Sequence, residues 1–78
     1  MKKRYLLFAS YDYAYHILRP LQREIRRQGH EVCWFLEDTC PDRLFDDEKK
    51  LVSFGEVKKY NPLAVLAAGN IVYDFFPG

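Results

Sequence analysis

Residues 4–37 read RYLLFASYDYAYHILRPLQREIRRQGHEVCWFLE, and this stretch decides the fold. It opens with a short apolar run, Tyr5–Ala9, and closes with a second one, Val32–Leu36. Continuous apolar runs of this length are typical of strands buried on both faces of a parallel sheet. A segment with helical periodicity joins the two runs, so the stretch has the length of a right-handed strand–helix–strand unit.

The joining segment is expected to form a helix over residues 14–28. Gly29 is the residue type favoured just past a helix C-terminus, and Asp12 is the expected N-cap. Pro20 lies inside the segment, but the apolar pattern continues on both sides of it, so we expect one helix with a bend at the proline. The stripe expected to pack on the sheet comprises Ala14, Ile17, Leu18, Leu21 and Ile25.

Four arginines lie nearly opposite this stripe: Arg19, Arg23, Arg26 and Arg27. The favoured interpretation is the solvated face of an amphipathic helix. Contact with anionic lipid is the alternative.

The remaining chain continues the alternation of strand and helix. We expect an acidic, solvated loop over residues 37–48 with one helical turn around Leu44, a strand at 51–54, a short helix at 55–60 and a strand at 64–68. Gly69 and Asn70 end the last strand, and residues 71–78 form an aromatic tail. The expected fold is α/β and Rossmann-like in three layers, with about four parallel strands and helices on both faces. Residues 1–78 are expected to be the incomplete N-terminal part of such a domain.

Composition excludes several classes of protein. A chain that is 49% hydrophobic and 17% aromatic is not expected to be disordered, and a net charge of +1 predicts no nucleic-acid partner. No segment has the roughly 18 apolar residues of a membrane span, and the apolar run at 5–9 is too short for a signal peptide, so a cytoplasmic location is expected. Cys33 and Cys40 fit neither a CxxC pair nor a zinc site, and we expect no catalytic role for them.

Doubly wound sheets bind ligands at the C-terminal ends of their strands. The first such turn, Ser10–Tyr13, contains no glycine, whereas a dinucleotide-binding turn reads GxGxxG, so no cofactor is expected. Glu37 and Asp38 follow the second strand, where such folds place a ribose-binding acid. The acidic loop lacks the spacing of a calcium loop, so no metal is expected either.

His16 is expected in the first turn of the helix, near this edge. It is a candidate for anion binding or acid–base chemistry, and the alternative is a surface histidine without a partner. Tyr11, Tyr13 and Tyr15 are suited to stacking on a sugar or a base, but packing against the neighbouring loop is the favoured interpretation.

Two sets of residues carry a family resemblance. The segments HILRPL (16–21) and GHEV (29–32) are similar to the first helix and second strand of GT-B nucleotide-sugar enzymes. The segments YNP (60–62), AGN (68–70) and DFFPG (74–78) resemble the N-terminal domain of CDP-glycerol glycerophosphotransferases. Those enzymes transfer glycerol phosphate or ribitol phosphate from a CDP-activated donor to a wall (teichoic acid) or capsule polymer, in a cleft between two Rossmann-like domains.

The resemblance implies an acceptor-binding edge rather than a complete active site. The residues it assigns to substrate binding are Ser10, Tyr11, His16, Gly69 and Asn70. The catalytic residues are expected beyond Gly78, so this part of the enzyme is expected to be inactive alone. The implied partners are an acceptor polyol phosphate or glycan polymer, the remainder of the parent chain, and the inner face of the membrane through peripheral contact.

A second hypothesis is a small binding or interaction module that forms a homodimer through an exposed sheet edge. A third, a response-regulator-like module, is disfavoured because Ala9 and Ser10 stand where an acidic pair is expected.

Overall fold

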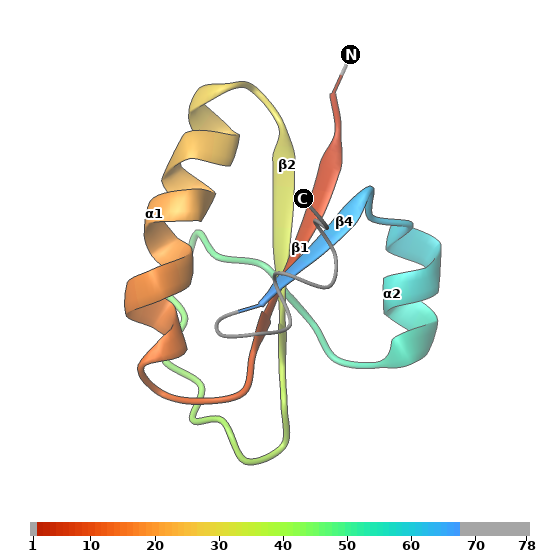
Figure 1. Cartoon of the computed structure of the whole chain (residues 1–78). Helices are drawn as coiled ribbons and strands as arrows, with labels where there is room; N and C mark the ends of the chain where they lie inside the picture. Colours follow the sequence, from red (N-terminus) through yellow and green to blue (C-terminus); the bar gives the residue numbers. More distant parts are fainter. Residues whose placement is uncertain (1, 68–78) are drawn as a thin grey trace, which may run out of the picture.

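The computed structural model describes residues 2–67, which form four strands and two helices (Figure 1). All strand pairs are parallel, and the strand order is β3-β2-β1-β4. This arrangement confirms the predicted α/β class with a Rossmann-like parallel sheet. In chain order the elements are β1 (Arg4–Ala9), α1 (Ala14–Arg27), β2 (Glu31–Leu36), β3 (Lys50–Leu51), α2 (Phe54–Tyr60) and β4 (Ala64–Ala67).

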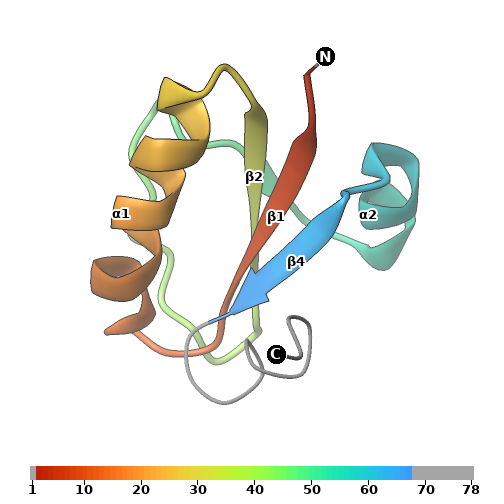
Figure 2. The same cartoon turned by 45° about the horizontal axis from the view of Figure 1, so that its top comes forward.

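The two helices lie on opposite faces of the sheet, as predicted (Figure 2). Side chains along β1 alternate between the faces: Leu7 belongs to the core beneath α1, and Leu6 belongs to the core beneath α2. Trp34 of β2 is fully buried in the larger core, and Cys33 beside it in the sequence is buried in the smaller one. Burial on both faces explains why these strands read as unbroken apolar runs.

Helix α1 is continuous through Pro20, so the prediction of one helix rather than a later start is confirmed. Gly29 has φ 82°, the left-handed conformation expected just past the end of the helix. The N-cap prediction was wrong. Tyr13 occupies that position without a capping side chain, because the carboxylate of Asp12 pairs with Arg43 instead.

The buried face of α1 is rotated relative to the predicted stripe. Ala14 and Leu18 are buried as expected, but Ile17 and Leu21 are 46% and 41% exposed. Tyr15 and Gln22 are buried in their place. The polar groups of both side chains form hydrogen bonds inside the protein. The spacing of apolar residues alone cannot predict that such polar side chains are buried.

The third strand is shorter than predicted and ends before Phe54, which begins α2. Ser53 caps this helix because its hydroxyl accepts a hydrogen bond from the backbone N–H of Glu56 (3.2 Å). The carboxylate of Glu56 accepts from the backbone N–H of Val52 (2.7 Å), in a variant of the capping box. The predicted strand over 64–68 is confirmed over Ala64–Ala67, and its last residue lies outside the described range.

Candidate functional site

The C-terminal ends of the four strands form one edge of the sheet, and the turn between β1 and α1 lies there. This turn lies where the strand order reverses, because β2 and β3 are added on one side of β1 and β4 on the other. Ligands of doubly wound sheets bind at such a switch point. This edge is therefore the candidate site.

Three of the five predicted binding residues lie at this edge. Ser10 directly follows β1 and is half-buried, while Tyr11 and His16 are exposed. Tyr11 stacks on Tyr13 with ring centroids 5.3 Å apart, and both rings are exposed, whereas Tyr15 is buried and its hydroxyl bonds to the neighbouring loop, as predicted. Gly69 and Asn70 lie outside the described residues.

The N-terminus of α1 carries the partial positive charge of the helix dipole, and the carboxylate of Asp12 lies just before its N-cap. Its N-cap has no side-chain hydrogen bond, and its first turn has no acidic residue. The backbone N–H groups of Ala14, Tyr15 and His16 donate to the carbonyls of the preceding turn, so the helix dipole is what favours an anion at this end. His16, exposed in the first turn, is placed to add a hydrogen bond to such a ligand.

Arg43 is a further residue at this edge, and sequence reasoning missed it. It forms an ion pair with Asp12, the residue before the N-cap of α1, and its guanidinium remains largely exposed. Its backbone N–H donates to the hydroxyl of Tyr15 (3.1 Å), which itself donates to the carbonyl of Pro41 (2.6 Å). Burial raises the pKa of Tyr15, so the phenol stays protonated as this donor. The only sequence signal was a basic residue in an acidic loop.

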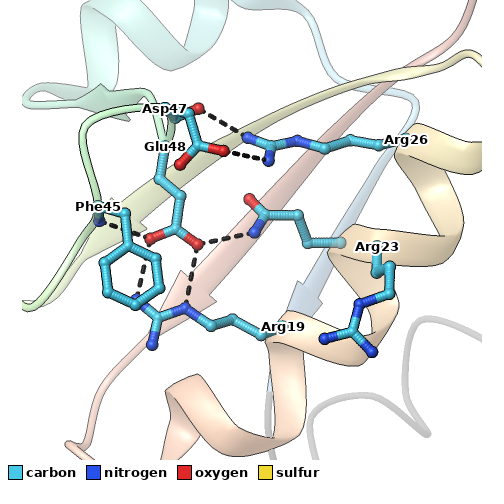
Figure 3. Close-up of a pocket in the computed structure, with 7 residues that line it drawn as sticks. Arg19, Arg23, Arg26, Phe45, Asp47 and Glu48 are labelled. Carbon is cyan, nitrogen blue, oxygen red and sulfur yellow. Dashed lines mark hydrogen bonds and ion pairs between the residues drawn. The ribbon is translucent and has the colours of Figure 1, made fainter.

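A cluster of hydrogen bonds and ion pairs holds the loop over residues 37–49 against α1. Its side chains surround a hollow of about 240 Å³ (Figure 3). Glu48, whose side chain is 1% exposed, accepts two hydrogen bonds from Arg19 (2.9 and 3.0 Å). Gln22 donates to the same carboxylate (2.7 Å) and accepts from the indole N–H of Trp34 (2.7 Å). Arg26 binds Asp47 in the same cluster (3.1 Å).

This cluster corrects two predictions. The acidic loop is not uniformly solvated, and no helical turn forms around Leu44. The arginine face is only partly free, because Arg19 and Arg26 bind the loop. Burial alone would raise the pKa of Glu48, but the hydrogen bonds from Arg19, Phe45 and Gln22 outweigh burial and lower the pKa to about 2. The buried polar side chains of the cluster all have partners, so we assign it to loop anchoring rather than to ligand binding.

A second hollow of about 240 Å³ lies at the C-terminal edge on the α2 side of the sheet. Glu37 and Asp38 border it, and the backbone N–H of Glu37 donates to the carbonyl of Ala9 (2.9 Å). Glu37 and Ser10 therefore follow paired positions on adjacent strands, at the spacing of about 4.8 Å between neighbours. Its remaining lining residues are Phe8, Phe35, Leu36 and Phe54.

Between residues 2 and 67, no three His, Cys, Asp or Glu side chains gather in a way that could hold a metal ion. Cys33 and Cys40 are free and buried, and burial raises the pKa of Cys33, so its thiol is a poor nucleophile.

The candidate edge thus combines an anion-favouring helix end with a hollow that bears carboxylates. Neither α1 nor α2 has the length and apolar character that crossing a membrane requires. Comparison of the chain with protein-family models, with curated proteins and with solved structures finds no match.

Proposed function

We propose that this chain is the acceptor-side part of a glycerophosphotransferase-like enzyme. The enzyme moves a polyol phosphate from a CDP-activated donor to a wall or capsule polymer in the cytoplasm, at the inner face of the membrane. The observation that carries the proposal is the uncapped N-terminus of α1 at the switch point, with His16 and Arg43 beside it. These groups suit the phosphate of a polyol phosphate acceptor.

One further feature supports this assignment over a dinucleotide-binding one. The β1–α1 turn contains Ser10 and Tyr11 but no glycine, so it cannot offer the close backbone approach that a pyrophosphate needs. The donor and the catalytic groups are assigned, on this proposal, to the remainder of the parent chain.

The test is the affinity of the chain for sn-glycerol 3-phosphate, measured by NMR titration. Arg43→Gln is expected to weaken binding about fivefold, since one charge at a helix end is worth roughly 1 kcal/mol. Arg27→Gln, at the opposite end of α1, is the matched control and should leave the affinity unchanged. CDP-glycerol should bind no more tightly than glycerol phosphate. Equal losses in both variants, or tighter binding of CDP-glycerol, would contradict the proposal.

A second candidate function is a self-associating interaction module. The observation that favours it is the exposure of Ile17 and Leu21 on α1, together with Leu63, which is 63% exposed just before the edge strand β4. This candidate predicts a concentration-dependent dimer in sedimentation velocity that the double substitution Ile17→Glu, Leu21→Glu abolishes. A chain that stays monomeric at millimolar concentration would rule it out.

A further inference from the structure

Three phenylalanine rings form a continuous stack at the C-terminal edge, on the face of the sheet that α2 covers. Phe8 of β1 and Phe35 of β2 have ring centroids 6.0 Å apart, and Phe35 and Phe54 have centroids 5.4 Å apart. Phe54, the first residue of α2, is 77% exposed. Phe54 therefore ends the stack with an aromatic ring that is free to contact a ligand at this edge.

The hollow beside this stack is small and has two chemically distinct walls. Its volume of about 240 Å³ is below the roughly 300–1,000 Å³ of sites for drug-sized ligands, so it suits a single ring. One wall is the apolar surface of Phe8, Phe35 and Phe54. The other is formed by Glu37 and Asp38, which are exposed and make no side-chain hydrogen bond or ion pair within the described part of the chain.

The carboxylates and the phenylalanine rings favour different parts of a ligand. Ionised carboxylates only accept hydrogen bonds, so they favour a ligand with several hydroxyl donors and repel a phosphate. The phenylalanine rings already stack on one another, which leaves no gap for a nucleobase to be sandwiched between them. An uncharged ring with one apolar face and vicinal hydroxyls satisfies both walls.

We propose that this hollow binds one neutral sugar ring of the acceptor, with the apolar face of the sugar on Phe54 and its hydroxyls donating to Glu37 and Asp38. The inference rests on the proposed function for the statement that the sugar belongs to the acceptor. The phosphate would then lie on the α1 side of the same edge, beyond Ser10, because Ser10 and Glu37 follow neighbouring strands.

The test uses the whole chain and methyl N-acetyl-β-glucosaminide as the probe. Saturation-transfer NMR should show contact between the protein and the sugar, and titration should give its affinity. Phe54→Ala should weaken binding about three- to tenfold, the range of a lost aromatic contact. Leu63 is similarly exposed but lies just before β4, at the N-terminal ends of the strands, so Leu63→Ala should have no effect. Glu37→Ala should also weaken binding several-fold.

Each contrary outcome has a defined meaning. The proposal is overturned if the sugar shows no contact, if Phe54→Ala and Leu63→Ala behave alike, or if cytidine binds the hollow more tightly than the sugar. Binding of glycerol phosphate at His16 without any sugar binding would overturn this inference and leave the proposed function standing. Sugar binding without glycerol phosphate binding would support the hollow and overturn the proposed function.

Discussion

At the scale of single residues, alanine substitutions at two glycines are expected to change the free energy of unfolding in opposite directions. Gly29 has φ 82°, and an added Cβ would meet nothing within 4 Å, so only backbone conformation opposes a side chain there. Gly55 lies within α2, where a Cβ would make an ordinary contact with the Ser53 hydroxyl at 3.7 Å. Gly29→Ala is expected to lower the free energy of unfolding by about 1–2 kcal/mol, and Gly55→Ala to raise it by up to about 1 kcal/mol. Urea denaturation of both variants checks the signs, and a shared sign would contradict the account.

Gln22 forms buried hydrogen bonds that the sequence pattern does not predict. Its amide accepts from Trp34 and donates to Glu48, so Gln22→Leu leaves a buried indole N–H without a partner. The expected loss of unfolding free energy is about 1–3 kcal/mol. Gln28→Leu, at the exposed C-cap of α1, is the control and should cost much less. Similar losses in the two variants would show that the buried chain of hydrogen bonds contributes little.

At the scale of elements, Pro20 is a residue type that disfavours a helix interior, yet it lies inside α1. It stands in the interior of α1, where it cannot donate to the carbonyl one turn earlier. Pro20→Ala restores that hydrogen bond and should raise the free energy of unfolding by about 2 kcal/mol, after the loosened unfolded chain is allowed for. Arg23→Ala, one turn later, serves as the control. A decrease in stability for Pro20→Ala would mean that neighbouring side chains depend on the proline.

Existence and type of the elements could be predicted from the sequence, because apolar runs and helical periodicity report burial. The strands β1, β2 and β4 lie within one residue of the predicted ranges over the described part, and α1 runs through its proline. The rotated face of α1 could not be predicted, since the buried Gln22 and Tyr15 are satisfied by partners 12 to 28 residues away. For the same reason Arg43 could not be assigned to the site from local pattern.

At the scale of the whole molecule, the carboxylate of Glu48 couples stability to pH. Its pKa falls from an ordinary 4.5 to about 2 in the folded chain. Its contribution is therefore present above about pH 4.5 and is lost as the pH falls toward 2. The full loss is on the order of 3 kcal/mol. The free energy of unfolding, measured between pH 6 and pH 2, should decrease as the pH falls. Glu48→Gln should make this slope smaller. An unchanged slope in Glu48→Gln would assign acid sensitivity to other groups.

The C-terminal edge of the sheet is proposed to bind the phosphate of an acceptor. The most direct measurement is the map of backbone amide shifts in a ¹⁵N-labelled chain during titration with sn-glycerol 3-phosphate. The shifts are expected to be confined to Ser10, Tyr11, the first turn of α1 and Arg43. Shifts confined to the opposite edge, around Lys3, Arg4 and Asn61, or no shifts at all, would contradict this proposal.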